Sequence, residues 1–357
     1  MRGMLQDTSP AARVGIQAVI PRPSVLLILL GIVAAIAVLN AMIGSVILDR
    51  FVTRMFIDMT LVVALQIFMG NSGILWFPHL GFAGIGAYAS VIFSMSPLQK
   101  MISLPQLYPF LAEVHFSFVV ALLLSAVIVA LLVAIITFPL MRLHDFPAVI
   151  ASFALLVVIH VVLTHWRELT NGPQTLFGVD RYTYAPTAAL WAGIAIVIAY
   201  LFKESRVGLQ LRASRDGRMA AASSGVNVVL VRWLAVILSA FVGAIGGGLY
   251  AHYITSFTPN AFYLQETFVI LSMIVIGGPA TVSGAVIGTF VVTVLLQGLR
   301  WIENSEMLAS AIPGGLAGIS NIALAVILIA ILVLRPGGLM AREELSLASL
   351  RHVRRRQ

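Results

Sequence analysis

The sequence predicts an all-α integral membrane protein, a polytopic helical bundle of about ten transmembrane helices. Of its 357 residues, 60% are hydrophobic and only 10% are charged, whereas roughly a quarter of the residues in soluble domains are charged. The hydrophobic residues form long uncharged runs without the alternation of a barrel strand, so α-helices must satisfy the backbone in lipid. The basic residues collect between these runs, where they can set the topology.

Ten segments qualify as crossings when about 20 apolar residues are required and shorter runs are accepted where a helix is broken. In chain order they are 24–48, 56–69, 81–95, 115–138, 148–165, 186–202, 228–252, 266–276, 282–299 and 316–334.

In the first half, Pro23 and Asp49 bound the first run, and the second ends at Gly70. A glycine-rich turn, GNSGILWFPHLG, then leads into a short third run. A more polar stretch with three prolines, 96–113, precedes the fourth run. Pro139 ends that run. Proline ends a helix because it lacks the backbone N–H and clashes with the preceding turn.

In the second half, the fifth run is followed by a polar loop, 166–184, with the turn signal Asn171-Gly172-Pro173. The seventh run contains four glycines (Gly243, Gly246, Gly247 and Gly248), which should let neighbouring helices approach closely. The eighth run is short, and Gly277-Gly278-Pro279 separates it from the ninth. The last run stops at Arg335-Pro336-Gly337-Gly338.

Ten crossings place both termini on one side of the membrane, and the basic residues indicate that this side is the cytoplasm. Eight or nine crossings remain alternatives, because either short run is also compatible with a re-entrant segment. The side with the termini would hold sixteen basic residues: Arg2, Arg13, Arg22, Arg142, Lys203, Arg206, Arg212, Arg215, Arg218, Arg232, Arg335, Arg342, Arg351, Arg354, Arg355 and Arg356. The opposite side would hold six: Arg50, Arg54, Lys100, Arg167, Arg181 and Arg300.

The predicted domain organisation is a cytoplasmic N-terminal tail (1–23), a transmembrane domain (24–340) and a basic cytoplasmic C-terminal tail (341–357). The first apolar run is too long for a signal-peptide core and has no convincing cleavage site, so we expect the first tail to be retained. The length leaves no room for a second soluble domain.

Several kinds of chemistry are not indicated. The chain has no cysteine, which excludes disulfides and thiolate metal sites. It has no aromatic and basic interleaving typical of nucleic-acid binding, no phosphate-binding GxxxxGK[ST] motif, no metal-ligand cluster and no GxSxG elbow. We therefore expect no enzymatic activity and no cofactor on this chain. A pump built from it would need an ATPase supplied by another chain.

The stretch 203–227 is the longest polar interruption. It contains five basic residues against Glu204 and Asp216, and we expect a helical core over 219–224. One interpretation is a basic loop held near anionic lipid headgroups. The other is a docking element for a cytosolic partner.

Two glycine-rich interruptions, 70–86 and 277–288, occur in corresponding halves of the chain. Such paired breaks indicate a transport pathway, because unwound backbone in a membrane is tolerated where protein or a water-filled cavity covers it. The alternative is close helix packing by small residues.

Four ionisable residues fall within or beside the predicted spans: Asp58, His160, Arg232 and Glu266. All but His160 lie near a predicted helix end, where they can reach the interface, and His160 is more typical of a packed residue than of a proton relay. His79 lies in the first glycine-rich interruption, where a structural role in the turn is favoured.

Five segments together resemble a known family. They are GNSGILWFPHLGFAGIGAY from Gly70, LTNGPQTLFGV from Leu169, SRVGLQLRASRDGRMAAASSGVNV from Ser205, LSAFVGAIGGGLYAHY from Leu238 and GGPATVSGAVIG from Gly277. In this order, over residues 70–340, they resemble LivM-like permease subunits of the branched-chain amino acid type of ABC importer.

The resemblance implies a type II (BtuC-like) permease in a bacterial inner membrane, with a second related permease, two cytosolic ATPase subunits that bind ATP and magnesium, and an external substrate-binding protein as partners. It implies that 203–227 is the coupling segment to the ATPase. The expected coupling residues are Arg212, Ala213, Arg215, Asp216, Arg218, Ala220, Ala221 and Gly225, all of them family-like except Arg218. The expected translocation path comprises Gly70, Gly73, Trp76, His79, Gly84, Gly86, Tyr88, Gly277, Gly278 and Gly284.

The chain departs from the family pattern at three places. Arg218 and Ala222 stand where acidic residues are usual, Ile74, Trp76 and Pro78 make the first interruption bulkier, and Thr175 replaces a glycine in an outer loop. Branched-chain or hydrophobic amino acids are the expected solutes, with urea, short amides or small carboxylic acids as alternatives. A self-contained secondary carrier is the alternative from another class.

Overall fold

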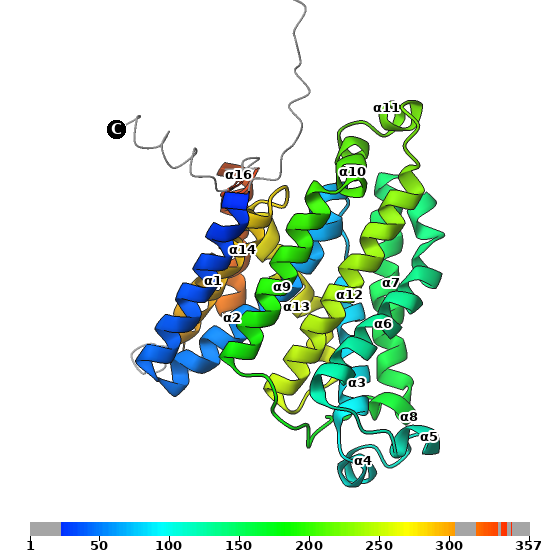
Figure 1. Ribbon diagram of the computed structural model, residues 1–357, viewed down its shortest axis with the longest axis vertical. Helices are drawn as coiled ribbons and strands as arrows, with labels where there is room; N and C mark the ends of the chain where they lie inside the picture. Colours follow the sequence, from blue (N-terminus) through cyan, green and yellow to red (C-terminus); the bar gives the residue numbers. More distant parts are fainter. Residues whose placement is uncertain (1–22, 304–318, 335–336, 341–343, 345–357) are drawn as a thin grey trace, which may run out of the picture.

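The computed structural model describes residues 23–303, 319–334, 337–340 and 344. The predicted tails therefore lie outside the described residues, apart from Pro23 and Glu344. The described part is an α-helical bundle whose long helices run roughly side by side (Figure 1). The predicted fold class, a helical integral membrane protein, is confirmed.

The first half of the bundle contains α1 to α8 and two short non-α turns. The bounds are α1 Pro23–Ile43, α2 Val46–Leu65, η1 Gln66–Gly70, α3 His79–Ser94, α4 Pro97–Ser103, α5 Pro109–Ala112, α6 Phe118–Thr137, η2 Leu140–Arg142, α7 Asp145–His165 and α8 Arg167–Thr170.

The second half begins with α9 and contains the polar segment. The bounds are α9 Ala185–Glu204, α10 Arg206–Asp216, α11 Arg218–Ser223, α12 Val228–Ile254, η3 Pro259–Phe262, α13 Leu264–Gly277, α14 Val282–Glu303 and α16 Ile319–Leu334. Residues Leu176 and Phe257 form an isolated β-bridge between two loops.

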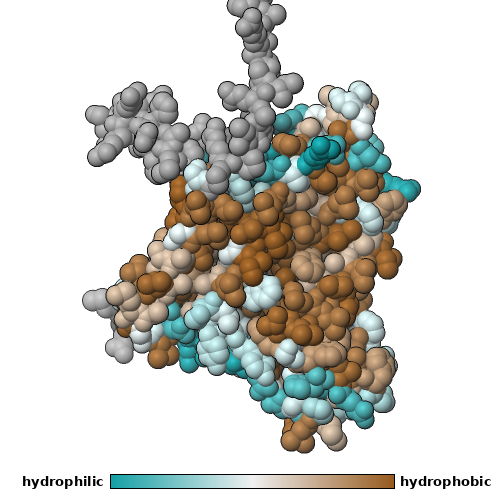
Figure 2. All heavy atoms as spheres, in the orientation of Figure 1, coloured by the Kyte–Doolittle hydropathy of each residue, from teal (hydrophilic) through white to brown (hydrophobic). Residues whose placement is uncertain are grey.

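Among the described residues, eight segments are long and apolar enough to cross a membrane. The helices α3 and α16 are shorter, with 16 residues each. Each of the ten predicted runs overlaps one of these helices. In Figure 2 a broad hydrophobic band crosses the visible face, with hydrophilic residues gathered toward its two ends.

The bounds of the first two runs were wrong. α1 ends at Ile43, and a turn at Gly44, with a φ of +64°, starts α2 ten residues earlier than predicted. The charges of Asp49, Arg50 and Arg54 therefore lie within the second helix. Hydropathy placed them in a connection because it cannot show that Arg54 is paired with Asp58 inside the fold.

The short eighth run is also longer than predicted, because η3 and α13 together give the 19-residue apolar segment Pro259–Gly277. In the first half, the non-helical break is confined to the short stretch from Gly73 to Pro78. Gly84 and Gly86, predicted to lie in the break, are within the regular helix α3. Gly284, predicted to lie in the second interruption, is within the regular helix α14.

Helix α12 lies in the core of the bundle and packs against α3, α6 and α2. Its glycines allow the backbones to approach closely, as predicted. A Cβ added at Gly247 would lie 1.9 Å from the carbonyl oxygen of Ala83 on α3, and one added at Gly86 would lie 2.6 Å from Cα of Ala244. The contact between α3 and α12 therefore requires glycine on both helices.

The helices α10 and α11 lie at one end of the bundle, together with the start of α1 and the end of α9 (Figure 1). The helices α4, α5 and α8 lie at the opposite end. At that end the buried Lys100 ammonium donates hydrogen bonds to the carbonyls of Leu111 and Val114, and burial lowers the pKa of Lys100. These bonds hold α4 against the loop that contains α5.

Candidate functional site

The polar segment 203–227 folds as two helices rather than the single helical core that the sequence predicted. Ser205 caps α10 by accepting a hydrogen bond from the Gly208 amide at 3.2 Å. Such a cap satisfies one of the free amides in the first turn of a helix. Because its residues are polar and it is only 11 residues long, α10 has no hydrophobic run that would reveal it.

A Schellman motif ends α11. The Val226 amide donates to the Ala221 carbonyl at 3.1 Å, and the Gly225 amide donates to the Ala222 carbonyl at 3.0 Å. Gly225 has a φ of +83°, in the left-handed region that glycine adopts without a steric penalty. Gly225 therefore ends α11 in the left-handed conformation.

The predicted coupling residues differ in their exposure and in their contacts with the rest of the bundle. Ala213, Arg215, Asp216, Ala220 and Gly225 are exposed, whereas Ala221 is buried against the bundle. Arg212 and Arg218, both half-buried, make the holding contacts. Nη2 of Arg212 donates to the Lys203 carbonyl at 2.9 Å, and Nη1 of Arg218 donates to the Leu143 carbonyl, in the connection between α6 and α7, at 3.3 Å.

Arg215 joins the polar segment directly to the first glycine break. Its Nη1 donates a hydrogen bond to the Gly70 carbonyl at 2.7 Å, although the two residues are 145 positions apart. Its aliphatic stem packs over Gly73, where a Cβ would lie 2.9 Å from Cγ of Arg215. Gly73 also has a φ of +74°, so both the backbone conformation and the space favour glycine there.

The two glycine breaks contact each other. A Cβ at Gly70 would lie 2.2 Å from the Pro279 carbonyl oxygen. Within the second break, Gly277 packs on the Gly284 carbonyl, and Gly278 has a φ of +109°. The sequence pairs these breaks by pattern, and the structure brings them together beneath α10.

The remaining predicted path residues are buried in side-chain packing. Trp76 packs edge-on against Phe68, with ring centroids 5.0 Å apart, and Tyr88 packs edge-on against Phe257 at 4.9 Å. Gly84 faces Phe262. His79 donates from Nε2 to the Leu61 carbonyl at 2.9 Å, and its ring lies against Gly243 near the middle of α12. His79 thus fixes the start of α3 against α2 and α12.

A cavity of about 420 Å³ lies at the end opposite α10 and α11, between the start of α2, the ends of α12 and α14, and the start of α13. None of the predicted path residues lines it. Its lining is Ile47, Arg50, Phe51, Arg54, Asp58, Tyr253, Ile254, Gln265, Glu266, Val269, Met273, Thr293, Leu296, Gln297 and Arg300.

An ion cluster forms one wall of this cavity. Nε of Arg54 donates to Asp58 at 2.9 Å, and its Nη2 donates to Glu266 at 2.9 Å. The guanidinium also lies 4.7 Å from the ring centroid of Tyr250. Arg50 and Arg300 are exposed at the cavity and, within the described residues, form no ion pair. The cavity therefore contains charges of both signs, with positive charge in excess.

The lining of the cavity also includes the apolar side chains of Phe51, Val269, Met273 and Leu296. Thr293 is 7% exposed, and its hydroxyl has no hydrogen-bond partner among the described residues. A buried hydroxyl without a partner is unusual in a folded protein. A solute or water in the cavity could satisfy it.

This site is not predicted by the sequence. Asp58 and Glu266 lie near separate predicted helix ends, from which each can reach the interface, and Arg54 lies in a predicted connection. The i, i+4 spacing of Arg54 and Asp58 was the available signal, since it places both side chains on one helix face. The contact with Glu266, 212 positions away, has no signal in a single sequence.

The other ionisable residues near the spans are packed. His160 stacks on Tyr263 with ring centroids 3.8 Å apart, and Arg232 is buried. In the part of the chain that the structure describes, no group of three or more His, Asp or Glu side chains could hold a metal ion.

A family model described as "Branched-chain amino acid transport system / permease component" matches residues 47–334. The high-affinity branched-chain amino acid transport system permease protein LivM of Salmonella typhimurium is 23% identical over 336 residues, which cover 83% of this chain and 71% of that protein. No solved structure gives a significant match.

Relatives with other solutes in their names match shorter regions. The nucleoside ABC transporter permease protein NupC of Lactococcus lactis is 32% identical over 84 residues, 24% of this chain and 26% of that protein. The ribose import permease protein RbsC of Haemophilus influenzae is 26% identical over 187 residues, 48% of this chain and 58% of that protein. The match spans only about a quarter of the length of the nucleoside and guanosine permeases.

Proposed function

Because the chain belongs to the family of branched-chain amino acid transport system permease components, we propose that it is a permease subunit of an ATP-driven ABC importer. It forms the solute path with a second related permease, above two cytosolic ATPase subunits that bind ATP and magnesium. A substrate-binding protein delivers the solute from outside. We place the complex in a bacterial inner membrane, with α10 and α11 in the cytoplasm.

The observation that supports this mechanism best is the hydrogen bond between Arg215 and the Gly70 carbonyl. It links an exposed helix to an intramembrane break. Closure of the ATPase dimer would favour one position of α10 and α11, and hydrolysis would release it, so the permease alternates between two conformations without chemistry of its own. The exposed residues Ala213, Asp216, Ala220 and Gly225 provide the contact surface for the ATPase.

Arg215→Glu and Gly225→Pro test this coupling in the complete transporter. We expect each to lower the solute moved per ATP hydrolysed by about tenfold while membrane insertion is retained. Arg215→Glu removes a hydrogen bond from a charged group, which contributes about 1.5 to 3 kcal/mol. Gly225→Pro disrupts the end of α11, because proline fixes φ at about −65° whereas Gly225 has a φ of +83°. Arg206→Glu is the control, since Arg206 is exposed on the same helix. Normal uptake in both test variants would remove the coupling assignment.

For the solute, we propose a branched-chain or other hydrophobic amino acid that enters through the cavity at the outer end. A lining with charges of both signs and with apolar side chains suits a zwitterion with an apolar side chain better than an uncharged sugar or nucleoside. From the cavity the solute would pass the two glycine breaks, with Trp76, His79 and Tyr88 as the side chains along the path. Urea, short amides and small carboxylic acids remain alternatives.

The solute is tested by ATP-driven uptake of labelled leucine, ribose, galactose and guanosine into vesicles that hold the complete transporter. Leucine should accumulate, and Arg300→Gln or Thr293→Val should raise its half-saturation concentration. Accumulation of a sugar or nucleoside in place of leucine would overturn the amino-acid proposal and leave the importer proposal intact.

One observation favours a second function, a self-contained secondary carrier. The buried Asp58 on α2 and Glu266 on α13 both contact Arg54, and a coupling ion could bind to these two carboxylates. Vesicles that contain this chain alone separate the two functions. As an importer subunit it should accumulate nothing under an imposed proton or sodium gradient. Concentration of any solute by the chain unaided would establish the carrier.

A further inference from the structure

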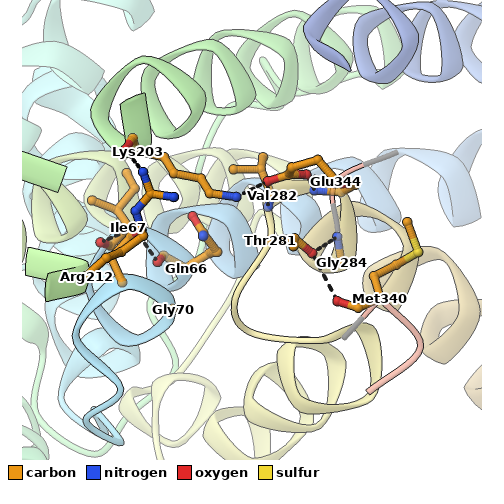
Figure 3. Close-up of polar contacts among 12 residues, drawn as sticks. Gln66, Ile67, Gly70, Lys203, Arg212, Thr281, Val282, Gly284, Met340 and Glu344 are labelled. Atoms are coloured by element: carbon orange, nitrogen blue, oxygen red, sulfur yellow. Dashed lines mark hydrogen bonds and ion pairs between the residues drawn. The ribbon is translucent and has the colours of Figure 1, made fainter. Parts of the chain in front are cut away.

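Glu344 caps the helix that follows the second glycine break. One carboxylate oxygen accepts a hydrogen bond from the Val282 amide at 3.0 Å (Figure 3). The other accepts from the Ser283 amide at 3.0 Å and from the Ser283 hydroxyl. The first amides of a helix have no partner within it, and a negative charge there also interacts favourably with the helix dipole. Glu344 thereby fixes the start of α14.

The same carboxylate is paired with the last turn of α9. Nζ of Lys203 donates to Oε1 of Glu344. The Lys203 carbonyl in turn accepts the hydrogen bond from Arg212 on α10 (Figure 3). The start of α14, the end of α9 and the first helix of the coupling segment are thus joined through three side chains, Glu344, Lys203 and Arg212.

Backbone contacts attach residues 337–340 to the second break. The Leu339 amide donates to the Ile276 carbonyl at 2.8 Å, and the Met340 amide donates to the Gly277 carbonyl at 2.9 Å. Gly338, with a φ of +76°, lies so close to Gly278 that a Cβ on it would be 2.6 Å from Cα of Gly278. This stretch is therefore held along the end of α13.

The charges of this network are partly removed from water. The side chain of Lys203 is 6% exposed and that of Glu344 is 17% exposed. Burial alone would raise the pKa of the Glu344 carboxyl, but Lys203 and the hydrogen bonds from Ser283 outweigh it and lower the pKa below its ordinary value. The carboxylate stays charged at neutral pH, so removing either partner leaves an uncompensated charge in a poorly solvated place.

We propose that residues 337–340 and Glu344 form a latch that ties the coupling segment to the second glycine break, with Glu344 as a positioning residue for transport. The latch rests on the proposed importer function. Arg215 connects α10 to the first break, and the Lys203–Glu344 pair connects the base of α10 to the second. A displacement of the coupling segment therefore moves both breaks together.

The contact is tested on the permease in detergent by amide hydrogen exchange of Val282 and Ser283. Glu344→Ala should speed their exchange about tenfold or more, since it removes both acceptors. Glu344→Gln should preserve more of the protection, because the amide side chain keeps one acceptor oxygen. Glu204→Gln is the matched control, as it removes the adjacent carboxylate at the same end of α9 and should change nothing. Unchanged exchange in Glu344→Ala would overturn the latch.

Its role in transport is tested in the complete transporter with Lys203→Met, Glu344→Gln and the double variant. Each single change should lower the solute moved per ATP about fivefold, and the double variant should be no worse than either, because both remove one ion pair. A purely structural contact would alter exchange and thermal stability but not this ratio, and that outcome would overturn the latch while leaving the importer intact. A wild-type complex without ATP-driven uptake would instead refute the importer and the transport role of the latch together, whatever the exchange result.

Discussion

At the scale of single residues, the cost of a substitution depends on backbone conformation and on charge pairing. Gly225 and Gly217 flank the same short helix, but only Gly225 has a left-handed φ. A residue with a Cβ in that region costs roughly 1 to 2 kcal/mol. At Gly217, where φ is −167°, an added Cβ would make an ordinary contact of 3.6 Å with Ala220.

We therefore predict that Gly225→Ala destabilises the C-terminal end of α11 by about 1 kcal/mol. Amide exchange should become faster at Val226 and at position 225. Gly217→Ala is the matched control and should leave exchange there unchanged. Equal effects of the two substitutions would show that the Schellman motif does not hold α11.

A second prediction at this scale concerns Arg54, whose positive charge pairs with the two carboxylates of Asp58 and Glu266. Arg54→Gln should destabilise the protein by about 1 to 3 kcal/mol, less than for a fully buried pair because the Arg54 side chain remains 28% exposed. Thermal unfolding in detergent measures the change. Adding Asp58→Asn should restore part of the loss, whereas Arg50→Gln, an exposed control that forms no ion pair with any described residue, should have little effect. A fully additive double variant would contradict the pairing.

At the scale of elements, the hairpin of α13 and α14 depends on glycine where the helices meet. A Cβ at Gly277 would lie 1.9 Å from the Gly284 carbonyl oxygen, and one at Gly288 would lie 2.0 Å from the Met273 carbonyl oxygen. Backbone atoms cannot move aside as the end of a flexible side chain can. The close packing that the sequence left as an alternative to a solute path is present here, and it does not exclude movement of the hairpin as a unit.

Gly277→Ala should accordingly lower the thermal unfolding midpoint, with a loss of about 1 to 3 kcal/mol typical of overpacking. Gly298→Ala on α14 is the control, because no atom of the described residues beyond the adjoining backbone of α14 lies within 4 Å of the added Cβ. It should be neutral or slightly stabilising, since alanine favours the helix by about 1 kcal/mol over glycine. A stable Gly277→Ala protein would show that the two helices can separate at little cost.

At the scale of the whole molecule, the helix directions place the coupling segment at one end and α4, α5 and α8 at the other (Figure 1). The distribution of basic residues predicts that the first end is cytoplasmic. Because the chain has no cysteine, single introduced cysteines can report the orientation without background.

Met219→Cys, on a side chain 82% exposed in α11, should react with an impermeant maleimide only from the cytoplasmic side. Phe110→Cys, 72% exposed in α5, should react only from outside. Ser125→Cys, within α6 and fully buried, is the unreactive control. The opposite labelling pattern would invert the topology and with it the assignment of α10 and α11 to an ATPase.

Much of the architecture was predictable because membrane solvation acts on each segment separately. A long uncharged run must form a helix in lipid whatever its neighbours are, and every predicted run overlaps a helix. The failures occurred where charge or polarity interrupts a run. The start of α2 was assigned to a connection, and α10 was missed, since its stability comes from a cap and from contacts with distant residues.

The sequence by itself determined the class of protein, the order of its helices, the two glycine breaks and the basic segment between α9 and α12, because each of these follows from local composition and solvation. Only the tertiary structure decided that the two breaks touch, that Arg215 reaches Gly70, that Arg54 reaches Glu266, and that Glu344 caps α14. Each of these contacts joins residues far apart in the chain, and the free energy of such a contact depends on a distance that no local pattern of residues encodes.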